Sequence, residues 1–156
     1  MLSQKPDLVV VMFGANDAAM VDGGPVARTE PRVPLSEYRS NLTRIVKTIQ
    51  AVGAAVVLCT PTPMSRAYAY SNLGAYATHE DMNYMLVEYA ATAREVARET
   101  GATLVDTFSA FMGRPDGLRL IQDGCHPNAA GQALIAETLT PIVRRAMIGR
   151  ETNSRQ

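Results

Sequence analysis

Residues 7–17 have the sequence DLVVVMFGAND, in which a continuously apolar run ends abruptly at a glycine. A strand that is covered on both faces is apolar throughout, so this run predicts a strand of a buried parallel sheet. Gly, Asn and Asp are typical of tight turns, which places a turn directly after the strand. Residues 54–59 (AAVVLC) and 102–106 (ATLVD) are runs of the same kind. The sequence therefore predicts three parallel strands.

Longer segments with helical periodicity separate these strands. In the first, residues 35–52, apolar side chains recur at the spacing of one helix face. Ser36 is the expected N-cap of this helix, and Gly53 follows it as a stop signal. We expect further helical segments at residues 80–100, 107–112 and 128–147, the last with a kink or restart at Pro141.

Strands that alternate with helices are typical of an α/β domain. We therefore expect a three-layer α/β/α fold with a parallel sheet of about three strands. The 156 residues suffice for one modest domain, which we place at residues 1–149, followed by a polar tail at residues 150–156. Sites in such folds form at the carboxyl ends of the strands.

The composition excludes several classes of function. Fifteen basic and fifteen acidic residues cancel, so the chain lacks the positive field that attracts nucleic acid. No apolar run approaches the ~20 residues of a membrane helix, and we expect no membrane partner. Two cysteines and two histidines are too dispersed for a zinc site or a disulfide framework. We expect no metal, no organic cofactor and a cytoplasmic protein.

Asp123 and His126 lie three residues apart in the loop DGCHP, just before the last helix. A carboxylate at this spacing can reach the imidazole across a tight turn, and Gly124 permits such a turn. An imidazole held in this way has a fixed tautomer and can act as a general base. The alternative is a capping aspartate beside an incidental surface histidine.

Asn16 follows the first predicted strand in the sequence GAND. Its amide is placed to donate a hydrogen bond to negative charge that develops above the sheet edge, and Gly14 allows a substrate to come close. The alternative is ordinary turn chemistry, in which Gly, Asn and Asp are common.

Taken together, FGAND (residues 13–17) and DGCHPN (residues 123–128) resemble two sequence blocks of the SGNH/GDSL hydrolase family. PLSEY (residues 34–38) and TPTP (residues 60–63) are similar to the isoamyl-acetate-hydrolysing esterase branch. The resemblance implies a flavodoxin-like fold and hydrolysis of carboxylic esters by a Ser-His-Asp mechanism, without a metal or organic cofactor.

The resemblance also implies roles for single residues. His126 is the base, Asp123 orients it, and Asn16 is the side-chain donor of the oxyanion hole. Asp17 braces its loop rather than reacting. The residues expected to bind substrate are Gly14, Ala15 and Met64. Tyr68, Tyr70 and Tyr76 either line an acyl or alcohol pocket or cover the sheet edge.

The Gly-Asp-Ser block that carries the family's nucleophile has no counterpart in this sequence. The sequence begins at what resembles the family's third strand, so we expect an N-terminally truncated domain whose activity is weak or absent. None of the serines follows a strand in a Gly-Asp-Ser setting. Cys125 lies next to His126, but neighbouring side chains in an extended turn usually point apart, so we expect Cys125 to pack.

Two functions stay open at this point. One is hydrolysis of short-chain acyl or small-alcohol esters, with removal of acetyl groups from carbohydrate as a variant. The other is a non-catalytic module that acts in binding or assembly. In both, the first strand is an unpaired apolar edge, and such edges pair with other chains. We therefore expect a homo-oligomer, a dimer or larger, through Val9, Val10, Val11 and Met12.

Overall fold

The structure is a computed structural model that describes residues 5–22 and 24–153. Its centre is a parallel sheet in the order β1 (Leu8–Met12), β2 (Ala55–Cys59) and β3 (Thr103–Val105). Val10 pairs with Val57, and Leu58 pairs with Leu104. The three predicted strands and the α/β class are confirmed.

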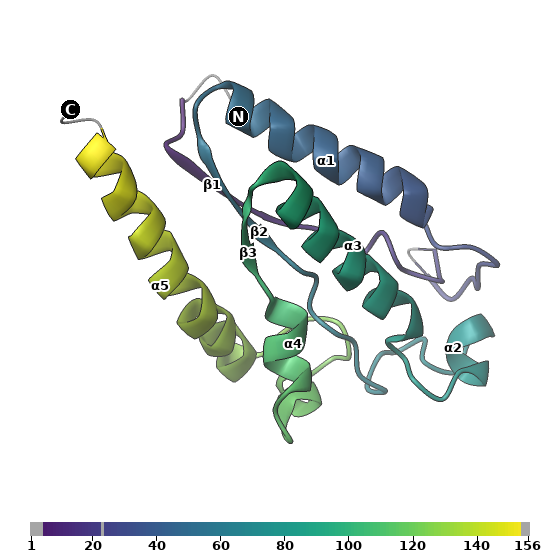
Figure 1. Cartoon of the computed structure of the whole chain (residues 1–156). Coiled ribbons are helices and arrows are strands. Elements are labelled where there is room, and N and C mark those ends of the chain that lie inside the picture. Colours follow the sequence, from purple (N-terminus) through teal and green to yellow (C-terminus); the bar gives the residue numbers. More distant parts are fainter. Residues whose placement is uncertain (1–4, 23, 154–156) are drawn as a thin grey trace.

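Helices cover the two faces of this sheet. Figure 1 shows α1 (Leu35–Ala51) and α3 (Tyr84–Thr100) on one face and α5 (Ala129–Asn153) on the other. The larger core lies under α1 and α3, where Leu42, Val46 and Tyr89 are buried. A smaller core around Val57 faces Leu139 of α5. These layers form the expected three-layer arrangement.

Three short helices complete the chain. α2 (Gly74–Thr78) lies in the long segment after β2 and was not predicted. α4 (Thr107–Met112) occupies the residues expected for it, and a 3-10 turn, Gly117–Leu120, follows. No helix in the described part of the chain is long and apolar enough to span a membrane.

Helix boundaries differ from the predictions at three places. Pro34, not Ser36, is the N-cap of α1, because the extended backbone of the proline already ends the preceding loop. α3 begins at Tyr84 because Asn83 turns its side chain to the backbone of Met64. α5 runs through Pro141 and continues to Asn153, into the expected tail, of which residues 154–156 lie outside the described residues.

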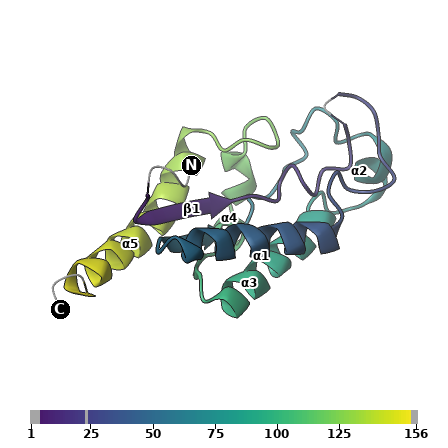
Figure 2. The same ribbon diagram turned by 90° about the horizontal axis from the view of Figure 1, so that it is seen from above.

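β1 is one of the two edge strands of the sheet, and Figure 2 shows it lying beside α1. Contrary to the prediction for a strand covered on both faces, it is only partly covered, and the Val10 side chain is 40% exposed. An apolar groove of about 640 Å³ runs between this edge and α1, and Phe13 lines its end. β2 is the strand that the flanking layers bury.

Candidate active site

Three loops meet at the carboxyl edge of the sheet and enclose a cleft of about 530 Å³. They follow β1, follow β2 and precede α5, as expected for a parallel α/β sheet. Of the predicted site residues, four line this cleft: Ala15, Asn16, Met64 and His126. Gly14 lies in an adjoining pocket of about 150 Å³, which also contains Ala15 and Asn16. Asp123 does not line the cleft, but its carboxylate contacts the imidazole of His126.

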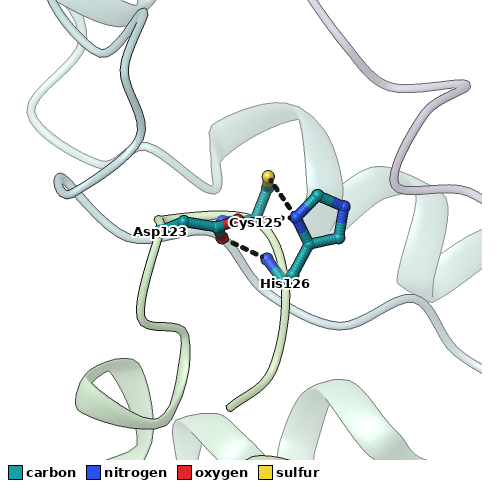
Figure 3. A group of neighbouring side chains, drawn as sticks. All are labelled: Asp123, Cys125 and His126. Carbon is teal, nitrogen blue, oxygen red and sulfur yellow. Dashed lines mark hydrogen bonds and ion pairs between the residues drawn. The ribbon is translucent and has the colours of Figure 1, made fainter.

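The loop before α5 holds Asp123 against His126. One carboxylate oxygen, Oδ2, lies 2.7 Å from Nδ1 of His126 (Figure 3). The other, Oδ1, accepts the backbone N–H groups of Cys125 at 3.0 Å and His126 at 2.7 Å. The aspartate therefore caps the turn and also holds the imidazole, so His126 is not an incidental neighbour of a capping residue.

Gly124 makes this turn possible. Its φ is +86°, and a Cβ added there would lie 1.9 Å from the backbone nitrogen of Tyr68. The carbonyl of Gly124 accepts the N–H of Ser65 at 3.0 Å, which ties the turn to the loop after β2. Only glycine fits this close approach, so the loops that carry His126 and the cleft wall are fixed to each other.

The electrostatics of the pair favour an ionised aspartate. The hydrogen bond with His126 and the two backbone N–H groups hold the pKa of Asp123 well below its usual range. A carboxylate that accepts Nδ1–H leaves the lone pair of Nε2 free to take a proton. The imidazole is reachable, because the side chain of His126 is 80% exposed.

A second loop presents Asn16. Gly14 has a φ of +126°, and its N–H donates to Asp17 Oδ2 at 3.1 Å, so Asp17 braces the turn. A Cβ at Gly14 would lie 3.1 Å from both Pro61 and the hydroxyl of Tyr38. Tyr38 in turn donates to the carbonyl of Phe13 at 3.1 Å. Contacts with Asp17, Pro61 and Tyr38 therefore fix the turn that carries Asn16.

Arg32 is a site residue that the sequence did not indicate. Its Nη1 donates to Asn16 Oδ1 at 3.3 Å, and its Nε donates to the carbonyl of Val21. The amide nitrogen of Asn16 has no protein partner within the described residues. Arg32 thus occupies the acceptor end of the amide and leaves the donor end for a substrate. Sixteen residues separate the two, and no local pattern predicts their contact.

The three tyrosines of the second loop have different roles. Tyr68 and Tyr70 line the cleft and meet edge to face, with ring centroids 5.4 Å apart. Tyr76 is buried in the core, where its hydroxyl accepts the N–H of Met20 at 3.0 Å. The first two tyrosines therefore line the cleft, and the third packs beneath them, with its ring centroid 6.0 Å from that of Tyr68.

Cys125 was expected to point away from His126, and that prediction is wrong. Its Sγ lies 3.3 Å from Nδ1 of His126, although it also packs against the larger core as expected. Asp123 draws both backbone N–H groups toward one carboxylate, which curls the loop and turns the two side chains the same way. Burial and the charge of Asp123 raise the pKa of Cys125 to about 11, so the thiol stays protonated and is a poor nucleophile.

No hydroxyl group hydrogen-bonds to His126 within the part of the chain that the structure describes. Ser65 lies in the nearby loop, but its Oγ donates to the carbonyl of Ile121 and accepts the N–H of Ala67. It therefore has a structural role. The described site therefore brings together the Asp123–His126 pair and the amide of Asn16, and no described hydroxyl engages the histidine.

Comparison with known proteins identifies the family. Residues 1–134 match the GDSL-like lipase/acylhydrolase family. The chain belongs to this family. A GDSL-like chain is what the FGAND and DGCHPN blocks predicted, and the family assignment is confirmed.

Curated relatives of this GDSL-like chain include esterases. The chain is 28% identical over 144 residues to the isoamyl acetate-hydrolyzing esterase 1 homolog of Homo sapiens, which covers 90% of the chain and 56% of that relative. It is 29% identical over 138 residues to the acetylxylan esterase of Geobacillus stearothermophilus, covering 86% of the chain and 58% of the relative. The chain thus spans a little more than half the length of these proteins.

Solved structures share the fold of the GDSL-like chain. A catalytic mutant of Axe2, an acetylxylan esterase from Geobacillus stearothermophilus, superposes with a TM-score of 0.68 at 25% identity, covering 88% of this chain and 59% of that one. The lipase/acylhydrolase from Enterococcus faecalis gives a TM-score of 0.70 at 23% identity, over 91% and 63% of the two chains. The SGNH hydrolase fold is thereby confirmed.

Proposed function

We propose that this site hydrolyses carboxylic esters, with His126 as the general base, Asp123 as its orienting partner and Asn16 as an oxyanion donor. The observation that carries the proposal is the 2.7 Å contact between Asp123 Oδ2 and His126 Nδ1, beside a cleft that Asn16 also lines. This contact keeps the proton on Nδ1 and leaves Nε2 to accept another. Membership of the GDSL-like family supports the same chemistry.

Each of these groups has one role in the proposed reaction. A nucleophilic oxygen attacks the ester carbonyl and gives its proton to Nε2 of His126, while Asp123 stabilises the imidazolium that forms. The amide nitrogen of Asn16 donates to the developing oxyanion, a contact whose loss costs about 10²–10³-fold in rate in related chemistry. The leaving alcohol then takes the proton back from Nε2.

The nucleophile is the part of this proposal that the described site does not supply. A triad without its nucleophile retains a residual ~10³–10⁴-fold acceleration over water from its remaining groups. We therefore expect slow hydrolysis by the chain alone, with water activated by His126. Faster hydrolysis requires a hydroxyl from another segment or another chain at the cleft.

The substrate class follows from the cleft and from the relatives. Met64 and Ile135 give the cleft apolar walls, and Tyr68 and Tyr70 add ring edges and hydroxyls. One relative is named as a homolog of an isoamyl acetate-hydrolyzing esterase and another as an acetylxylan esterase, and both names refer to acetyl esters. We propose a short acyl group as the common feature of the substrate, with the alcohol part unassigned.

Hydrolysis of p-nitrophenyl acetate by the purified chain tests the proposal. His126→Ala should remove the protein-dependent rate, and Asn16→Ala should lower it, because each removes a group that acts in the transition state. His79→Ala is the matched control, since His79 is the other exposed histidine and stacks on Tyr84, with ring centroids 3.8 Å apart.

Loss of activity in the His126 and Asn16 variants, but not in the His79 variant, supports the assignment. Equal rates for His126→Ala and His79→Ala would contradict it. The activity would then be explained by nonspecific reaction of exposed imidazole groups.

A second candidate function is assembly without catalysis. The apolar groove beside β1 and the exposed side chains of Val10 and Phe13 (40% and 54%) favour it. We propose that two copies associate through this edge. A twofold axis across the edge pairs β1 with its copy in antiparallel orientation, so that the same apolar surface is buried on both copies. The dimer is compatible with either function.

A further inference from the structure

The loop at residues 123–126 gathers three different donor atoms in one place. They are a carboxylate oxygen of Asp123, the sulfur of Cys125 and Nδ1 of His126, all within 4.8 Å of one another. Figure 3 shows the three side chains converging on the ring nitrogen. Because the cysteines and histidines are dispersed in the sequence, no zinc site was predicted. This cluster nevertheless combines one cysteine, one histidine and a carboxylate from the same turn.

The distances from Nδ1 to the other two donor atoms are close to what a tetrahedral metal ion needs. Zn–N and Zn–O bonds of about 2.0–2.1 Å and a Zn–S bond of about 2.3 Å place ligand atoms about 3.3–3.6 Å apart. Sγ of Cys125 and Nδ1 of His126 are already 3.3 Å apart. Asp123 Oδ2, at 2.7 Å from Nδ1, has to withdraw by about half an ångström. Its side chain is 57% exposed and has room to do so.

We propose that Asp123, Cys125 and His126 bind a soft divalent cation such as Zn²⁺, through Sγ, Nδ1 and one carboxylate oxygen, and that the bound ion switches off the base. Thiolate and imidazole donors select zinc over magnesium or calcium, which prefer oxygen ligands. The exposed imidazole leaves access for the ion and for water as a fourth ligand.

Inhibition follows because a neutral imidazole ring has two nitrogens but only one proton. In the metal-free site Nδ1 carries a proton and donates it to Asp123, so Nε2 has a free lone pair. An ion bound at Nδ1 occupies the lone pair of that nitrogen, so the ring proton moves from Nδ1 to Nε2, which can no longer accept one. Binding also releases the thiol proton of Cys125 to solvent. This inhibition rests on the proposed esterase function, whereas the binding itself does not.

Cobalt(II) titration of the purified chain tests the binding without any assay of activity. A thiolate bound to Co²⁺ gives a charge-transfer absorption in the near ultraviolet, and we expect a saturable band in the wild-type chain. Cys125→Ser should abolish the band, and Cys59→Ala, which removes the other free cysteine, should retain it. Even outer-shell partners of metal ligands are worth about 10–100-fold in affinity, so loss of His126 should weaken binding by at least about 100-fold.

Zn²⁺ should compete for the same site, displace the cobalt band and lower ester hydrolysis in the wild-type chain. In Cys125→Ser the zinc effect, measured against that variant's own metal-free rate, should be lost. Absence of a saturable band, or a band that persists in Cys125→Ser, would overturn the proposal. A chain that binds cobalt but hydrolyses no ester refutes the esterase function and leaves the metal site standing.

Discussion

At the residue scale, aspartates fix the loops around the cleft. Asp123 and Asp17 each accept backbone N–H groups of their own turn. Asp106 does the same between β3 and α4, where it accepts Ser109 N–H and binds Arg94 through two nitrogens at 2.9 and 3.1 Å. Thr60, at the end of β2, donates to the same carboxylate. One side chain thus joins two strand ends to a helix.

The pKa of Asp106 makes this junction testable. Burial raises the pKa, but the bonds from Arg94 and Ser109 outweigh burial and lower it from 3.8 to about 2. A lowered pKa in the folded state adds stability above the unfolded value, and that stability is lost as pH falls toward 2. Asp106→Asn should lower the free energy of unfolding by about 1–2 kcal/mol at neutral pH, after allowance for solvent screening.

Denaturant unfolding at neutral pH and again near the folded pKa measures this effect. The deficit of Asp106→Asn should shrink at the acidic pH, where the wild-type carboxylate is also becoming neutral. Asp116→Asn is the control, because the Asp116–Arg114 pair is exposed on both sides and should matter little. A deficit that is the same at both pH values would show that charge is not its cause.

At the element scale, β1 contributes both to the cleft and to an exposed edge of the sheet. Its carboxyl end delivers the turn with Asn16 to the cleft, and its outer edge is open. Native proteins rarely leave an apolar edge uncovered, because its free N–H and C=O groups pair with other strands. The proposed dimer therefore covers the edge of the strand that leads into Asn16, the proposed oxyanion donor.

Sedimentation of the purified chain tests the role of the β1 edge. The wild-type chain should sediment as a dimer, and Val10→Lys should shift it toward monomer, because a charge at the centre of the edge opposes pairing. Val87→Lys is the matched control, since Val87 on α3 is 41% exposed, almost the same as Val10 at 40%. A wild-type monomer, or equal dissociation in both variants, would count against the edge contact.

At the scale of the whole molecule, the sequence predicted what local patterns encode. Apolar runs indicated all three strands, and the Asp123–His126 pair follows from a spacing of three residues across one turn. Contacts between distant segments were missed. Arg32 reaches Asn16 from another part of its loop, and Asn83 shortens α3 by bonding to Met64. The orientation of Cys125 was missed because it depends on which N–H groups Asp123 accepts.

We propose that Asp123 fixes His126 with its proton on Nδ1, so that Nε2 is the base. The ¹⁵N chemical shifts of the histidine ring nitrogens, measured at mildly alkaline pH in the wild-type chain and in Asp123→Asn, test it most directly. His79 serves as an internal reference in the same spectrum. We expect a protonated Nδ1 and an unprotonated Nε2 in the wild type, and loss of that preference in the variant. A proton on Nε2 of wild-type His126 would contradict it.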